Sequence, residues 1–423
     1  MRSGQKLLAA FLFVTVLTVA IGSMCLSASA ADKPVTLNMW SWRTEDANAW
    51  NEVITEFEKS NPDIQVKFHP YKDTEYDTII STALQSGAGP DIYQVRPYNH
   101  SLIDAGYAMA LDGLVPELSN FPKAALNAAR SSKDDRAYGV PYAFATAQIY
   151  YNKTIFAKYG LKEPRTWDEF VDICRTVASK GVTPLAQGTK DGWTLSLALS
   201  IFGPNVYGGN DFVTKFLSGN TRLTNPKFVA SIERMRELAP YFMKNHTGVP
   251  YTDTQIMFAM EQAAMFAGGS YEYGYFTKLN PNIKLGVFPA PTEDGSPGLI
   301  SSWASASYAG NPKTKYPQQV ITFLRFLGSV KFGQMMTEKL RIISPIKGVK
   351  VSDPVVKEMY RLAQEQSTPH FAVLYLSNGS PSGKKVLEDN LQGMYLGKVS
   401  PQEVAQNVDK AIEGWFVPYQ GKR

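Results

Sequence analysis

Apolar positions along this chain follow two alternating periods, which predict strands separated by helices. Residues 35–39 alternate apolar and polar side chains as a half-buried strand does, and the apolar residues of 47–57 then recur at helical spacing. The same order returns in a strand over 64–68, a helix over 76–84 and a strand over 91–95. Strands separated by helices of this length predict an α/β fold with a mostly parallel sheet, whose ligands bind beyond the carboxyl ends of the strands.

A second region of the same kind begins near Tyr138, with a strand expected over 147–152. Thr166 and Glu169 have the spacing of a capping box, which predicts the start of a helix. Cys174 lies on the apolar face of that helix, so we expect it to be a buried core residue. The other expected elements are strands over 263–267 and 300–309, a mainly helical region from Tyr316 onward, and a terminal helix over 401–415.

The first thirty residues have the pattern of a secretory signal. Basic side chains within 2–6 precede an apolar run over 7–21, and small residues follow up to Ala30, where we expect cleavage. The apolar run is shorter than the roughly 18 to 20 residues that cross a bilayer. Removal of the signal takes Cys25 away and leaves Cys174 without a disulfide partner.

Composition and charge exclude some classes of function. About 390 residues remain after the signal, enough for two or three domains. A hydrophobic content of 44% supports well-buried cores. The formal net charge of +5 falls to +3 without the signal, and Lys and Arg are not clustered. Nucleic-acid binding needs such a cluster, so we expect no nucleic-acid partner.

Six short motifs follow one another in an order and spacing that resemble one family. They are Leu-Asn-Met-Trp at 37–40, Gly-Ala-Gly-Pro-Asp-Ile at 87–92, Tyr-Gly-Val-Pro-Tyr at 138–142, Tyr-Tyr-Asn-Lys at 150–153, Thr-Trp-Asp-Glu-Phe at 166–170 and Ala-Ala-Met-Phe-Ala-Gly-Gly-Ser at 263–270. Together they resemble the extracellular solute-binding proteins of carbohydrate importers, the family that contains maltose-binding and trehalose-binding proteins. The resemblance covers nearly the whole chain after the signal.

The resemblance implies a two-lobe periplasmic-binding-protein fold of the type II kind. Each lobe would be a mostly parallel sheet flanked by helices, with the ligand in the cleft between the lobes. Lobe 1 would hold residues 32–142 and 300–345, and lobe 2 residues 143–299 and 346–423. The resemblance also implies a monomer that has no cofactor or metal and that delivers a small carbohydrate to the permease of a membrane ABC importer. The protein would be located in the periplasm or, in a Gram-positive cell, outside the cell in association with its membrane.

A carbohydrate offers apolar C–H faces and a rim of hydroxyls, so its binder needs flat aromatic rings and hydrogen-bonding edges. In the family, sugar contacts come from the loop after the first strand and from the end of the third. The candidates there are Trp42, Arg43 and Glu45 after the first strand, and Gln94, Arg96 and Tyr98 after the third. For Arg96 a salt bridge on the lobe surface is the alternative reading.

Further candidates come from the crossing segment and from the second lobe. Relatives often place an acid at the position of Ala145, and Thr146 and Gln148 could replace it with neutral hydrogen bonds. The remaining candidates are Trp193 and Tyr207 in a glycine-rich stretch, Tyr271 as a stacking ring with Glu272 as an acceptor, Trp303 as a second stacking ring, and Arg341 at another connection. We expect Tyr271→Ala and Trp303→Ala to remove ligand binding and to leave the unliganded melting point nearly unchanged.

Two other classes stay open at this point. An exported carbohydrate-processing enzyme is one, although the four histidines are scattered without metal-ligand spacing and the chain has no Gly-x-Ser-x-Gly motif. A glycosidase would need only a pair of carboxylates, which sequence cannot exclude. A binder of ferric ion is the other class, suggested by Tyr150 next to Tyr151. The Asn-Lys that follows this pair favours a sugar binder.

Overall fold

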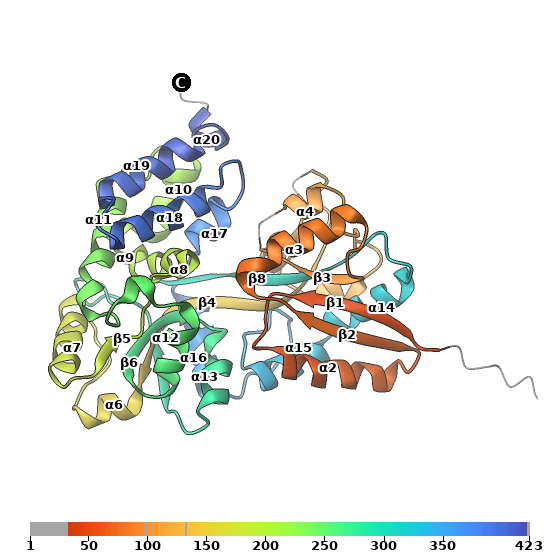
Figure 1. Cartoon of the computed structure of the whole chain (residues 1–423), viewed down its shortest axis with the longest axis horizontal. Helices are drawn as coiled ribbons and strands as arrows, with labels where there is room; N and C mark the ends of the chain where they lie inside the picture. Colours follow the sequence, from red (N-terminus) through yellow and green to blue (C-terminus); the bar gives the residue numbers. More distant parts are fainter. Residues whose placement is uncertain (1–32, 98–99, 132, 421–423) are drawn as a thin grey trace, which may run out of the picture.

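The computed structural model describes residues 33–97, 100–131 and 133–420, so the expected signal and Tyr98 lie outside the described residues. Two α/β lobes lie side by side, and strands β4 and β8 run from one lobe into the other (Figure 1). Within the described ranges, no helix combines the length and the apolar character that crossing a membrane requires.

One sheet passes through both lobes in the order β2-β1-β3-β8-β4-β6-β5, with β7 added to β4 and β9 added to β8. The strands are β1 Val35–Ser41, β2 Ile64–Pro70, β3 Ile92–Val95, β4 Val140–Asn152, β5 Thr183–Leu185, β6 Ala263–Gly269, β7 Leu285–Phe288, β8 Ile300–Gly310 and β9 Ser367–Pro369. All the strands expected from sequence are present, most of them extended by a few residues.

The crossing strands correct the expectation of mostly parallel sheets. Pairs β1–β2, β1–β3, β5–β6 and β8–β9 are parallel, but β3–β8, β4–β8, β4–β6 and β4–β7 are antiparallel. The physical reason is that β4 carries the chain out of the first lobe and β8 carries it back. Two strands that cross the same boundary in opposite directions can pair only in antiparallel fashion. A third link joins the Phe144 amide to the Ile343 carbonyl at 2.8 Å.

The helices cover the two faces of the sheet in each lobe. Those of the first lobe are α2 Ala47–Ser60, α3 Asp73–Ser86, α4 Ser101–Asp104, α5 Lys123–Leu126, α14 Pro317–Leu327 and α15 Val330–Leu340. Those of the second are α6 Lys153–Lys158, α7 Trp167–Ser179, α8 Gly192–Phe202, α9 Pro204–Tyr207, α10 Gly209–Leu217, α11 Pro226–Glu237, α12 Tyr251–Ala259, α13 Glu272–Leu279, α16 Pro354–Glu365, α17 Phe371–Tyr375, α18 Gly383–Tyr395, α19 Pro401–Ile412 and α20 Val417–Gln420.

Local signals in the sequence explain where two of these helices begin. The Thr166 hydroxyl accepts a hydrogen bond from the Glu169 amide at 3.2 Å, as a helix-capping residue does. The Glu169 carboxylate, however, accepts from the amide of Arg165, one residue earlier than a full capping box requires. Ser400 and Glu403 form the complete box at the start of α19, which ends at Ile412 rather than at the expected position 415.

Separate hydrophobic clusters fill the two lobes. One joins residues between 37 and 143 to residues between 306 and 346, and two others lie in the second lobe. Ile300 and Ile343 pack with second-lobe residues, so the limits of the lobes at 142, 299 and 345 stay predictions. Cys174 is fully buried, as predicted, and its burial raises the pKa of the thiol to about 12.

Candidate ligand-binding site

The carboxyl ends of β1 and β6 meet where the two lobes face each other. The guanidinium of Arg43, just after β1, lies 5.1 Å from the centre of the Tyr271 ring, just after β6. Nearby, the ammonium of Lys278 on α13 is 3.5 Å from the carbonyl oxygen of Glu45. These contacts bring Arg43 and Glu45 of the first lobe next to Tyr271 and Lys278 of the second, at strand ends where ligands of α/β folds bind.

Trp42 is a half-buried ring held by its own lobe. The guanidinium of Arg96 lies 4.4 Å from the centre of one ring face, and Tyr76 packs edge-on at 5.4 Å. The Trp42 amide donates to Gln94 Oε1 at 3.1 Å, and the Ser41 hydroxyl donates to the same oxygen at 2.6 Å. Gln94 is fully buried, so it positions the loop that carries Trp42.

Arg43 is paired inside its own loop. Its Nη1 lies 2.8 Å from a Glu45 carboxylate oxygen, and its Nε donates to Asp46 at 2.9 Å. Burial opposes the charged form of Arg43, but the carboxylates of Asp46 and Glu45 outweigh burial and raise its pKa well above the ordinary value. The side chain of Glu45 is therefore engaged with Arg43.

Arg96 is paired with two carboxylates on α3. Its Nη1 donates to Asp73 at 2.7 Å and its Nε to Asp77 at 3.0 Å. Burial lowers the pKa of Arg96, and Asp73 with Asp77 raises it by more, so the arginine keeps its charge. This is the salt bridge that the sequence analysis named as the alternative reading. Arg96 therefore anchors the ring of Trp42 to α3.

Tyr271 rests on a floor of small residues. A Cβ atom built at Gly269 would lie 2.2 Å from Cε1 of the Tyr271 ring, so only glycine lets the ring lie against the strand. Gly269 pairs with Ala147 in β4, and Ala145 pairs with Trp303 in β8. Tyr271 packs against the same hydrophobic cluster as these two alanines and Trp303. One face of the sheet thus carries both predicted rings, with small side chains between them.

Trp303 is a buried residue, whereas Tyr271 is only partly buried. It is 7% exposed, and its ring packs edge-on against His370 at 4.7 Å. Burial, helped by Lys384, lowers the pKa of His370 to about 3, so the imidazole is neutral near pH 7. His370 Nδ1 has no hydrogen-bond partner within the described ranges. Trp303 is a core residue in this conformation, which contradicts the expectation that its loss would leave the melting point unchanged.

Glu272 is enclosed rather than presented to a ligand. It is 1% exposed; the Tyr251 hydroxyl donates to one of its oxygens, and Gln255 Nε2 donates to the other at 2.7 Å. Tyr251 is also held by its amide, which donates to Asp191 at 2.7 Å, and by Trp193, whose ring lies edge-on at 4.6 Å. The predicted acceptor Glu272 therefore orients Tyr251. Sequence reasoning missed Tyr251, because its partners lie on other elements.

The buried carboxyl of Glu272 makes stability depend on pH. Burial raises its pKa from 4.5 to about 7, against the effect of its hydrogen bonds from Tyr251 and Gln255. The native state therefore binds more protons than the unfolded chain between about pH 4.5 and 7, and stability should fall as pH rises through that window, by on the order of 3 kcal/mol. Chemical denaturation at pH 5 and pH 7.5 measures the fall. Glu272→Gln should flatten the dependence, and an unchanged slope in that variant would contradict this role.

The other predicted residues occupy varied positions. Thr146 and Gln148 are fully buried on β4, and the Thr146 hydroxyl and both ends of the Gln148 amide lack hydrogen-bond partners among the described residues.

Arg341 has a left-handed backbone with φ of 53°, and its Nη1 lies 3.2 Å from the Tyr273 hydroxyl and 3.5 Å from Asp353. That pairing directs Arg341 toward Tyr273 and Asp353 rather than toward Arg43 and Tyr271.

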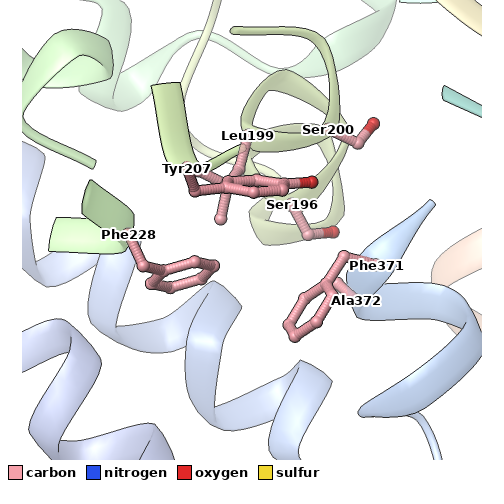
Figure 2. A pocket seen from close by; sticks show the side chains of 7 residues that line it. All are labelled: Ser196, Leu199, Ser200, Tyr207, Phe228, Phe371 and Ala372. Carbon is pink, nitrogen blue, oxygen red and sulfur yellow. The ribbon is translucent and has the colours of Figure 1, made fainter. Parts of the chain in front are cut away.

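Tyr207 belongs to the interior of the second lobe, not to the lobe boundary. It is 3% exposed and, with Phe228 and Phe371, surrounds a small cavity between helices (Figure 2). The cavity has room for about one water molecule, and the Tyr207 hydroxyl is without a hydrogen-bond partner in the described part of the chain. It is too small for a sugar.

The adjacent tyrosines of β4 do not form an ion site. The Tyr150 hydroxyl donates to the Gly269 carbonyl at 2.9 Å, whereas the Tyr151 hydroxyl donates to Glu163 at 2.6 Å. Their rings belong to different hydrophobic clusters, as alternation along a strand requires. Among the residues that the structure describes, no group of three or more His, Cys, Asp or Glu side chains could hold a metal.

Two α/β lobes joined by crossing strands, with Arg43 of one lobe lying over the Tyr271 ring of the other, define a two-lobe binding protein. The model of the family described as bacterial extracellular solute-binding protein matches residues 40–332. The chain belongs to this family.

Relatives and solved structures agree with this assignment. The multiple sugar-binding protein of Streptococcus mutans is 28% identical over 351 residues, covering 79% of this chain and 81% of that protein. The melibiose/raffinose/stachyose-binding protein MelE of Bacillus subtilis is 23% identical over 431 residues, covering 94% of each. The structure of RafE in complex with raffinose superposes with a TM-score of 0.76 at 22% identity, covering 90% of this chain and 99% of that one. The structural likeness shows the shared two-lobe fold.

Proposed function

We propose that this protein is the substrate-binding component of an ABC-type sugar importer. It captures a mono- or oligosaccharide between its lobes and delivers it to the membrane permease, without catalysing a reaction. The observation that carries the proposal is the contact between Arg43 of the first lobe and the Tyr271 ring of the second, at the carboxyl ends of β1 and β6, with the half-buried ring of Trp42 next to Arg43 in the chain. Half-buried aromatic rings bordered by hydrogen-bonding groups suit the faces and edges of a sugar.

The mechanism is a shift of population between open and closed arrangements. A ligand that touches Trp42 on one lobe and Tyr271 on the other makes both sets of contacts only when the lobes are closed. Its differential affinity for the closed form sets how far the equilibrium moves, and the permease recognises the closed form. The expected secretory signal supports a location in the periplasm or, in a Gram-positive cell, outside the cell in association with its membrane.

A thermal-shift screen over neutral sugars and sugar acids tests the proposal. A sugar at 100 times its dissociation constant should stabilise the native state by about 2.7 kcal/mol, which raises the melting temperature measurably. Each sugar that stabilises is then incubated with the protein and analysed by chromatography. Stabilisation with the sugar recovered intact supports a binding protein. Cleavage of the sugar would instead indicate the enzyme class, and the absence of any stabilising sugar would refute the proposal.

A further inference from the structure

The arginines at the lobe boundary are already neutralised by the protein's own carboxylates. We propose that the ligand is therefore an uncharged sugar, and not a sugar acid, a sugar phosphate or an amino sugar. The inference rests on the proposed function and deepens it, because it states which chemical class of sugar the site accepts.

Arg43 has no free pair of parallel N–H groups with which to bind an anion. A carboxylate or phosphate binds arginine best through two parallel N–H groups. Asp46 already occupies Nε at 2.9 Å and Nη2 at 3.3 Å, while Glu45 lies 2.8 Å from Nη1. The face of the guanidinium lies over the Tyr271 ring, and the side chain is only 13% exposed. A ligand anion would have to displace one of the two carboxylates.

Arg96 is saturated in the same way. Its Nε donates to both oxygens of Asp77 at 3.0 and 3.2 Å, its Nη1 to an Asp73 oxygen at 2.7 Å, and its Nη2 to the Asp73 carbonyl at 3.0 Å. One face of the guanidinium covers Trp42. Two carboxylates surround one cation, so the local charge balance opposes a second anion.

The other charged groups near the boundary do not change this balance. Arg341 pairs with Asp353, and Lys278 is an exposed side chain whose charge is screened by solvent. Asp191 and Glu272 accept hydrogen bonds from neutral donors, which adds acidic rather than basic character. Glu272 is enclosed with both oxygens engaged, so it offers no open carboxylate to the ammonium of an amino sugar.

Three buried residues with unpartnered polar atoms, one near the end of β3 and two within β4, are neutral. Gln94 Nε2, the Thr146 hydroxyl and the Gln148 amide have no hydrogen-bond partner within the described segments, although all three residues are fully buried. Amides and hydroxyls exchange hydrogen bonds with sugar hydroxyls without any charge. An unsatisfied buried polar group costs free energy, so a polyhydroxylated neutral guest that reaches these groups would relieve that cost.

Matched pairs of sugars test the inference by isothermal titration calorimetry on the full mature protein. The probes are lactose and lactobionic acid, galactose and galacturonic acid, and diacetylchitobiose and its deacetylated dimer, together with any neutral sugar found in the thermal screen and its 6-phosphate. The neutral member of each binding pair should bind at least about 10-fold tighter. Equal or tighter binding of a charged member would overturn the inference while leaving the proposed function intact. Binding of neither member in any pair would instead refute the proposed function.

A charge-release variant tests the physical reason. Asp73→Asn with Asp77→Asn frees Arg96, and both carboxylates are partly or largely exposed, so the fold should tolerate the change. The ratio of acid to neutral affinity should rise by about 10-fold or more and should weaken with added salt. Asp172→Asn, which removes the surface partner of Arg175 on α7, is the matched control and should leave the ratio unchanged. An unchanged ratio in the double variant would contradict neutralisation of Arg96 as the cause of the selectivity.

Discussion

Trp303→Ala is expected to lower the free energy of unfolding by about 3 to 5 kcal/mol, as large-to-small substitutions in a core do. Trp303 is 7% exposed on β8, opposite Ala145, and its ring meets His370 edge-on. Removal of the indole would open a cavity that small neighbours such as Ala145 and Ala147 cannot fill. Urea denaturation followed by circular dichroism measures the loss.

Tyr360→Ala is the matched control for this variant. Tyr360 is an aromatic residue that is 42% exposed on α16, so its removal should change stability by less than about 0.5 kcal/mol. If Trp303→Ala unfolds like the unsubstituted protein but no longer binds sugar, then Trp303 is an open stacking surface in solution. In that case Trp303 is buried only when the lobes are closed.

Tyr271→Ala is expected to weaken sugar binding by about 30- to 150-fold and to leave the unliganded melting point nearly unchanged. Loss of a central aromatic contact costs about 2 to 3 kcal/mol of binding free energy, which corresponds to this range. Tyr271 is only half buried, and it packs on Gly269 and under Arg43 without filling the core. Calorimetry with the best sugar from the thermal screen measures the affinity.

A glycine pair provides an independent check of the same ring. Gly269→Ala would place a methyl group 2.2 Å from the Tyr271 ring and should displace it, so sugar binding should weaken although Tyr271 is still present. Gly248→Ala is the control, because a Cβ there meets no atom within 4 Å. Equal affinity of both variants and of the unsubstituted protein would show that the position of this ring does not matter for binding.

The sequence predicted Tyr271 and Trp303 as equivalent stacking rings, but the structure buries them to different degrees. Tyr271 follows β6 and Trp303 lies within β8, and both match positions where relatives place stacking residues. The difference lies in their surroundings: His370 and the second-lobe core close over Trp303, whereas Tyr271 is only partly buried against that core and lies between Gly269 and Arg43 of the other lobe. Such partners lie far away along the chain, so periodicity around either residue cannot reveal them.

The ion pairs of Arg96 likewise depend on residues that are distant along the chain. The sequence presented Arg43 and Arg96 as free donors for a ligand, with a salt bridge as the alternative for Arg96. Asp46 could be guessed for Arg43, because it is three residues away in one loop. Asp73 and Asp77 could not be guessed for Arg96, because they reach it only when α3 packs beside β3.

Local periodicity by itself determined the succession of strands and helices and the buried thiol of Cys174, and six ordered motifs showed the resemblance to one family. The elements and the buried thiol follow from the spacing of apolar residues over a few positions, which can be read from the sequence without knowing the fold. Only the tertiary structure decided that the crossing strands pair antiparallel, that Glu272 is enclosed by Tyr251 and Gln255, and which rings and charges remain open to a ligand. Those properties depend on which distant segments exclude water from each side chain, and burial of that kind exists only after the two lobes have folded and met.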